Sequence, residues 1–165
     1  MTRKRDRRKH KGRSESGTFS AVPHAVQDSA AWRMCSATGI KLLMCLLRQY
    51  NGRNNGDLCA ALSMLRVHGW RSPETVFTAL LELRHYGLIL LTRQGGLRMP
   101  SLYALTWLAI NECGGKLTDL GPTITAPGTW RRTAAPFVRA SRKKTNTPAV
   151  AASYASRSDE PKKAA

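Results

Sequence analysis

The feature that most constrains this chain is the segment "GWRSPETVFTALLELRHYG", residues 69–87, which carries the start and stop signals of one helix. Ser72 is a good N-cap residue, and Pro73 suits the first helical turn, where its missing N–H costs nothing. Gly87 can take the left-handed conformation in which helices commonly end. We therefore expect a helix over residues 73–86, around which the rest of the fold is built.

Two β-like runs follow this helix directly. "LILLTRQ" and "SLYALTW" lie on either side of a Gly-Gly pair, and the second run alternates its side chains as a strand does. Gly95 and Gly96 suit a two-residue hairpin turn, whereas Pro100 favours a longer loop over residues 94–100. The sequence does not decide between the two-residue turn and the longer loop, and either one predicts a β-hairpin.

Shorter elements are expected before this helix. "ATGIKLLMCLLRQY" follows a capping Ser36 and is apolar around most of its circumference, which predicts a buried central helix over residues 37–50. The turn sequence "NGRNNG" comes next, followed by a very short strand at Asp57 and Leu58 and a compact helix over residues 60–67. A short helix over residues 26–34 precedes them all.

The expected order is therefore helix, short strand, helix, tight turn, capped helix and hairpin. On the residues "SPETVFTALLELRHYGLILLTRQGG" and "SLYALTW", the stretch from residue 36 to 107 resembles the winged-helix domains of bacterial and phage regulators and replication initiators. The resemblance implies a mainly α fold with a small β-hairpin (α+β) and a winged helix-turn-helix core. It also implies that the start of the 73–86 helix and the hairpin, or wing, face DNA.

Positive charge is concentrated at the two ends of the chain. Of 27 Lys/Arg and 10 Asp/Glu, residues 1–17 hold eight and two, and residues 114–165 hold ten and three. Segments of this kind bury too little apolar surface to fold. We predict a disordered basic arm over residues 1–17, a folded domain over 18–115, and a basic, mostly disordered tail rich in Pro, Ala and Thr over 116–165. Such arms bind polyanions, because each neutralised phosphate releases counterions.

On the 73–86 helix, apolar side chains spaced at 100° cover roughly 220° of the circumference. They are Val76, Phe77, Ala79, Leu80, Leu81, Leu83 and Tyr86. The exposed arc is expected to hold Glu74, Thr75, Thr78, Glu82 and His85, with Glu82 in solvent. Because this arc has no Lys or Arg, positive charge for a polyanion must come from flanking residues.

The residues expected to contact DNA come from three places. They are Arg66, Arg71, Ser72, Glu74, Thr75 and Thr78 around the helix start, Arg93, Gln94, Gly95, Gly96 and Arg98 on the wing, and Arg3, Lys4, Arg5, Arg7, Arg8, Lys9, Lys11 and Arg13 in the arm. Arginines and helix N-terminal amides suit phosphates, while Thr can contact a thymine methyl and Glu a cytosine amino group. As structural alternatives, Glu74 stabilises the helix N-terminus and the wing arginines deter strand pairing.

The sequence shows no pattern of catalysis or metal binding. Its four cysteines form no C-x-x-C pair and have no histidines at zinc spacing, and there is no phosphate loop or nucleophile elbow. We therefore expect no enzyme activity, no cofactor and no metal. The longest apolar run, "IKLLMCLL", is too short to span a bilayer, so we expect no membrane association and a cytoplasmic, nucleoid-associated protein.

Together these features predict sequence-specific binding of double-stranded DNA, as in a transcriptional regulator of a bacterial or mobile element. A plasmid or phage replication initiator or partitioning factor fits the same architecture. Two other classes also fit: a winged helix used for protein contact with arms that bind nucleic acid non-specifically, and an RNA-binding or nucleoid-associated protein. A homodimer and a protein partner bound through the tail also stay open.

Overall fold

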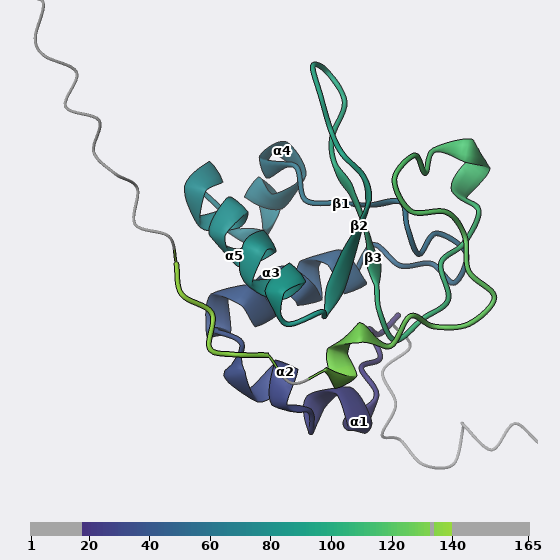
Figure 1. Ribbon diagram of the computed structural model, residues 1–165. Helices are drawn as coiled ribbons and strands as arrows, with labels where there is room; N and C mark the ends of the chain where they lie inside the picture. Colours follow the sequence, from purple (N-terminus) through teal and green to yellow (C-terminus); the bar gives the residue numbers. More distant parts are fainter. Residues whose placement is uncertain (1–17, 133, 140–165) are drawn as a thin grey trace, which may run out of the picture.

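The computed structural model describes residues 18–132 and 134–139 of the 165-residue chain (Figure 1). Its elements are α1 (His24–Gln27), α2 (Ala30–Met34), α3 (Ala37–Leu47), β1 (Leu58–Cys59), α4 (Leu62–Leu65), the 3-10 helix η1 (Arg66–His68), α5 (Pro73–His85), β2 (Ile89–Arg93), β3 (Leu102–Leu105), and the 3-10 helices η2 (Cys113–Gly115) and η3 (Thr129–Arg131). The predicted α+β class is confirmed, since these helices accompany a three-stranded antiparallel sheet. The predicted arm over residues 1–17 and residues 140–165 of the predicted tail lie outside the described residues.

From α3 to β3 the elements follow the predicted order, with differences in the shortest ones. The helix expected over residues 26–34 is divided into α1 and α2, because the Ser29 hydroxyl accepts a hydrogen bond from the Trp32 N–H (3.2 Å) and starts a new helix. The helix expected over residues 60–67 consists of α4 continued by η1, and it ends at Gly69, whose φ is +81°. Gly69 therefore makes the tight turn that leads toward α5.

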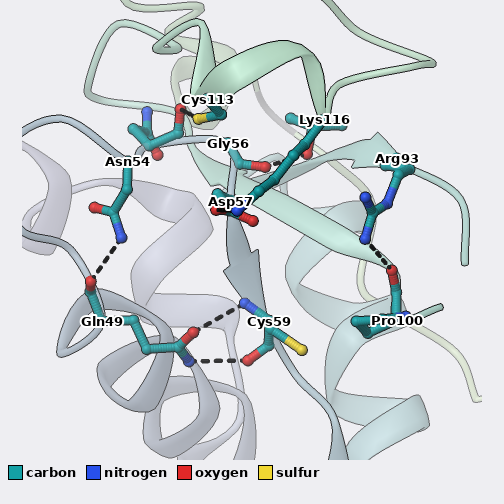
Figure 2. A network of polar contacts seen from close by, with 11 residues as sticks. Gln49, Asn54, Gly56, Asp57, Cys59, Arg93, Pro100, Cys113 and Lys116 are labelled. Carbon is teal, nitrogen blue, oxygen red and sulfur yellow. Dashed lines mark hydrogen bonds and ion pairs between the residues drawn. The ribbon is translucent and has the colours of Figure 1, made fainter.

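The sheet has the strand order β1-β3-β2, so the return strand of the hairpin is central. All four residues of β3 are buried, and both of its faces are therefore covered. β1 is an edge strand, and the side chain of Gln49, just after α3, occupies its outer edge. The Gln49 amide donates to the Cys59 C=O and accepts from the Cys59 N–H, both at 2.9 Å (Figure 2). Gln49 thus binds the strand as a neighbouring backbone would.

The core lies between α3, α5 and the sheet. α3 contributes Leu42, Leu43, Leu46 and Leu47, all buried, and its capping Ser36 accepts from the Gly39 N–H at 3.0 Å, as the sequence predicted.

Within residues 18–132 and 134–139, none of the helices has the length and hydrophobicity of a membrane span.

A buried asparagine joins the turn before β1 to the end of β3. The Asn55 side chain is 0% exposed, and its amide donates to the carbonyls of Leu105, Leu108 and Ala109 at 3.0–3.1 Å. Its carbonyl oxygen accepts from the Leu105 N–H at 2.7 Å. Asn55 therefore satisfies four backbone groups where the sheet ends, and a buried backbone group without a partner is costly.

The packed part of the chain continues beyond residue 115, where composition had placed its end. Trp130 is only 8% exposed and belongs to the core, and Phe137 packs against the same core. The hydroxyl of Thr129 donates to the Gly87 carbonyl at 2.7 Å, and a Cβ at Gly87 would lie 2.8 Å from the Thr129 carbonyl oxygen. Residues 116–132 and 134–139 are thus part of the domain, since a few large apolar side chains anchor a segment that is polar on average.

Candidate nucleic-acid interface

The start of α5 is formed as the sequence predicted. The Ser72 hydroxyl accepts from the Thr75 N–H at 3.3 Å, Pro73 occupies the first turn, and Gly87 follows with φ +67°. Arg71 and Thr75 are exposed at this end of the helix. The arrangement presents the helix N-terminal amides and the exposed Arg71 to solvent, which together favour an anion such as a phosphate.

The hairpin projects well beyond the sheet. In Figure 1 its tip, α4 and the amino end of α5 all lie toward the top of the view. Arg66, just after α4, and Arg98, near the hairpin tip, are both exposed. The structure therefore places Arg66, Arg71 and Arg98 on segments that face the same side, although each comes from a different element.

The connection between β2 and β3 is close to the longer loop considered, but its tip is a two-residue turn that lies beyond Gly95 and Gly96. Gly96 and Met99 bond to each other through both backbone groups, at 3.0 and 3.2 Å, so Leu97 and Arg98 form the tip. Leu97 is 92% exposed and Arg98 has φ +63°. Gly95 lies below the tip, where a Cβ would come within 2.5 Å of the Ser101 nitrogen. The tip therefore exposes one apolar and one basic side chain.

The two wing arginines have different environments. The guanidinium of Arg93 folds across the hairpin and donates to the Pro100 carbonyl at 3.1 Å (Figure 2). The neighbouring Gln94 is exposed, and its backbone N–H donates to the Asp119 carboxylate at 2.7 Å. Arg98 is thus the exposed wing arginine at the tip, while Arg93 braces the hairpin.

The exposed face of α5 differs from the one that helical spacing predicted. Glu82 was expected in solvent, but it is 7% exposed and accepts from the Ser36 N–H (2.8 Å) and the Ser36 hydroxyl (2.6 Å). The prediction was wrong because a carboxylate is stabilised at the N-terminus of a neighbouring helix, here α3. Phe77, expected in the apolar sector, is 60% exposed. The buried face of α5 is therefore narrower than roughly 220° and partly polar.

Replacing Glu82 by Gln is expected to destabilise the domain by about 1–3 kcal/mol, because a neutral amide has one oxygen where the carboxylate accepts two hydrogen bonds. Urea unfolding measures this change. Glu112→Gln, at an exposed carboxyl, is the matched control and should alter stability by less than about 0.5 kcal/mol. Equal stability of the two variants would contradict the role assigned to Glu82.

Glu74 and Thr78 lie on the side of α5 that faces the end of the described chain. The Arg139 guanidinium and the Glu74 carboxylate form an exposed ion pair at 2.5 Å. Thr78 is half-buried. Glu74 is therefore paired rather than free for a base, and the more open predicted positions at this end are Arg71 and Thr75.

The four cysteines of the described chain are free, and burial works against ionisation of two of them. Burial raises the pKa of the Cys35 thiol to about 12, and the Glu82 carboxylate adds to the effect. Burial also raises the pKa values of Cys113 and of the Tyr103 phenol. Thiols of this kind stay protonated at neutral pH and are poor nucleophiles. Within residues 18–132 and 134–139, no group of three His, Cys, Asp or Glu could hold a metal ion.

Comparisons with protein-family models, curated proteins and solved structures found no match.

Sequence reasoning missed one basic residue of this surface. Arg139 was placed in the tail, yet it contacts the first turn of α5. The signal was present in "PFVRASRKK", where an aromatic residue that can anchor the segment precedes a run of basic residues.

The arm residues Arg3, Lys4, Arg5, Arg7, Arg8, Lys9, Lys11 and Arg13 lie outside the described residues.

Proposed function

We propose that this protein binds double-stranded DNA in a sequence-specific manner through a winged helix-turn-helix domain. The observation that carries the proposal is the arrangement of α5 and the hairpin. A capped helix with an exposed amino end follows a helix and a tight turn, and a long hairpin projects toward the same side (Figure 1). In winged-helix proteins these elements are the recognition helix and the wing.

Charge supports the same proposal. The whole chain has a formal net charge of +17, and eight of its 27 Lys/Arg lie in residues 1–17. Non-specific attraction to phosphates gives salt-dependent affinity, while contacts of α5 with bases supply discrimination. The proposed division is that Thr75 contacts bases, Arg66, Arg71 and Arg98 contact phosphates, and the basic arm strengthens binding to any duplex.

The proposed setting is transcriptional regulation in a bacterium or a mobile element. The same architecture also fits a plasmid or phage replication initiator or partitioning factor. The location that follows from this proposal is the cytoplasm, on the nucleoid.

A second candidate function is protein contact through α5. Phe77 is 60% exposed and Leu81 38%, one turn apart on the same helical face. Paired apolar side chains of this kind are common in protein interfaces. In this alternative the basic arms bind nucleic acid without sequence preference. A second copy of the chain is among the partners that this face fits.

The replacement of Arg71 and Thr75 by Ala tests which function applies. For a duplex selected from a random-sequence pool by the intact chain, we expect the double variant to lose about 10- to 100-fold in its preference over a scrambled duplex. Arg33→Ala, on α2 at the bottom of Figure 1, is the control and should keep the preference. An unchanged preference in the double variant would show that α5 does not discriminate, and would favour the protein-contact alternative.

A further inference from the structure

The tip of the hairpin combines exposed apolar side chains with a basic one. Leu97 is 92% exposed, and Met99, which follows the two tip residues, is 54% exposed. Arg98 lies between them, and residues 94–101 include no Asp or Glu. A single exposed leucine is ordinary in a soluble protein, so its meaning depends on how the tip is held and on what surrounds it.

Hydrogen bonds at successive levels brace the hairpin up to its tip. The backbone bonds between Gly96 and Met99 close the turn at 3.0 and 3.2 Å. Below them the Gly95 N–H donates to the Ser101 hydroxyl at 2.9 Å, and the Arg93 guanidinium crosses to the opposite strand. The tip is therefore presented by a braced support, and a ligand that binds it has little conformational entropy to remove.

Arg98 occupies a backbone conformation that favours glycine. Its φ is +63°, in the left-handed region, at the second of the two central residues of the turn. Turns with a positive φ at this position normally have Gly or Asn there. The chain has two glycines just before the tip, yet it carries an arginine where the backbone would accept one more easily. Backbone strain of this kind is found mainly where a side chain has a functional role, and a guanidinium suits phosphates.

The tip also has the size of one of the two grooves of DNA. The minor groove is about 6 Å wide and 7.5 Å deep, whereas a helix with its side chains measures about 10–12 Å and fits only the major groove. Paired strands lie about 4.8 Å apart, and here two residues close the turn between them. The tip projects toward the same side as the amino end of α5 (Figure 1). With α5 in the major groove, the tip is narrow enough for the adjacent minor groove.

We propose that the hairpin tip is a wedge for the minor groove: Leu97 enters between two adjacent base pairs and bends the duplex, while Arg98 binds the phosphates that border the same groove. Apolar side chains such as Leu and Met unstack base steps in this way in proteins that bend DNA from the minor groove. The lack of acidic residues at the tip, and the exposed Arg66 and Arg71 on the same side, favour DNA over an apolar protein surface as the occupant.

This inference rests on the proposed function and adds a second way of reading sequence to it. Contacts of α5 read base edges, whereas a wedge reads how easily a step is deformed. TA and CA/TG steps unstack most easily, so we expect one of them at the position where Leu97 enters.

Bending of a duplex tests the wedge. A duplex selected from a random-sequence pool by the full chain carries a fluorescence donor at one end and an acceptor at the other, and 2-aminopurine replaces one base at a time. The full chain is expected to bend this duplex by about 20–90° and to raise the 2-aminopurine emission at one step. Leu97→Ala should lose more than half of the bend and of the emission change. Its affinity should fall by less than about 10-fold, because the lost apolar contact and the avoided unstacking offset each other.

Arg98→Gly separates a phosphate contact from a structural role. Glycine accepts a φ of +63° without strain, so the thermal stability of the domain should change little. The loss of one phosphate contact should lower the logarithmic salt slope by about 1. A salt slope equal to that of the unaltered chain would overturn the role assigned to Arg98.

Two further variants serve as controls for Leu97. Leu97→Met keeps an apolar side chain at the tip and should keep the bend. Ile124→Ala removes a fully exposed apolar side chain from the loop between η2 and η3 and should leave the bend unchanged. A duplex that stays straight when the full chain binds, or that bends equally with Leu97→Ala, would overturn the inference while leaving DNA binding in place. If the full chain binds no duplex even at low salt, the proposed function fails, and this inference fails with it.

Discussion

Deletion of residues 1–17 is expected to lower the affinity for every duplex by about 10²–10⁴-fold near physiological salt. The segment holds eight Lys/Arg and two Asp/Glu. Each phosphate that such a segment neutralises adds about 0.9 to the logarithmic salt slope, because counterions are released. If about half of these eight basic residues are engaged, the slope should fall by about 3–5 after the deletion. Fluorescence anisotropy over a salt series measures both quantities.

The control compares the loss of affinity for two duplexes of different sequence. The arm is expected to contact the backbone rather than base edges, so a selected duplex and a scrambled duplex should lose affinity by similar factors. Thermal unfolding should be unchanged, since the described core is built from residues between Val22 and Phe137. A loss confined to the selected duplex, or an unchanged salt slope, would show that the arm does not act as proposed.

Asn55→Asp is expected to reduce the free energy of unfolding by about 4 kcal/mol or more, which is a large part of the total for a domain of this size. The Asn55 amide donates to three carbonyls, and a carboxylate has no proton to donate. The aspartate would either remain charged among carbonyl oxygens or take up a proton at a cost in free energy. Urea unfolding measures the effect.

A neighbouring residue provides the matched control. Asn54 is half-buried and donates one hydrogen bond, to the Gln49 carbonyl at 2.9 Å (Figure 2). Asn54→Asp should therefore cost only about 1 kcal/mol. If Asn55→Asp were no more destabilising than Asn54→Asp, the Asn55 network would not be the connection that fixes the end of β3.

The parts of the fold that the sequence predicted are those specified by local signals. Ser72 and Pro73 mark the start of α5, and Gly87 marks its end. The structure has the helix between these residues. The hairpin was likewise expected from two short β-like runs around glycines. Such features follow from backbone preferences and capping, which neighbouring residues determine.

The parts that the sequence did not predict depend on residues far apart. Glu82 is buried because Ser36 lies opposite it, 46 residues away, and no helical wheel contains that partner. Trp130 joins the core from a stretch whose average composition indicated a tail. Asn55 lies in a turn sequence that only shows where the chain reverses, not that its side chain binds the end of β3.

The exposure and contacts of the proposed site residues were predicted in the same uneven way. Arg66, Arg71, Thr75 and Arg98 are exposed on elements that face one side, as helix order and turn positions suggested. Two other predicted residues have partners that are distant in the chain: Arg93 bonds to the Pro100 carbonyl across the hairpin, and Glu74 pairs with Arg139. The contact of residues 134–139 with α5 was not predicted, since nothing local shows that Phe137 and Arg139 lie against this helix.

The most direct test of the proposed function is the ratio of two affinities. A duplex selected from a random-sequence pool is compared with a scrambled duplex of the same length and base composition, over a series of salt concentrations. Specific binding predicts a ratio on the order of 10³ or more, maintained while both affinities fall steeply with salt. A ratio near one at every salt concentration would mean that the chain binds DNA only through its charge, and would contradict sequence-specific recognition by α5 and the wing.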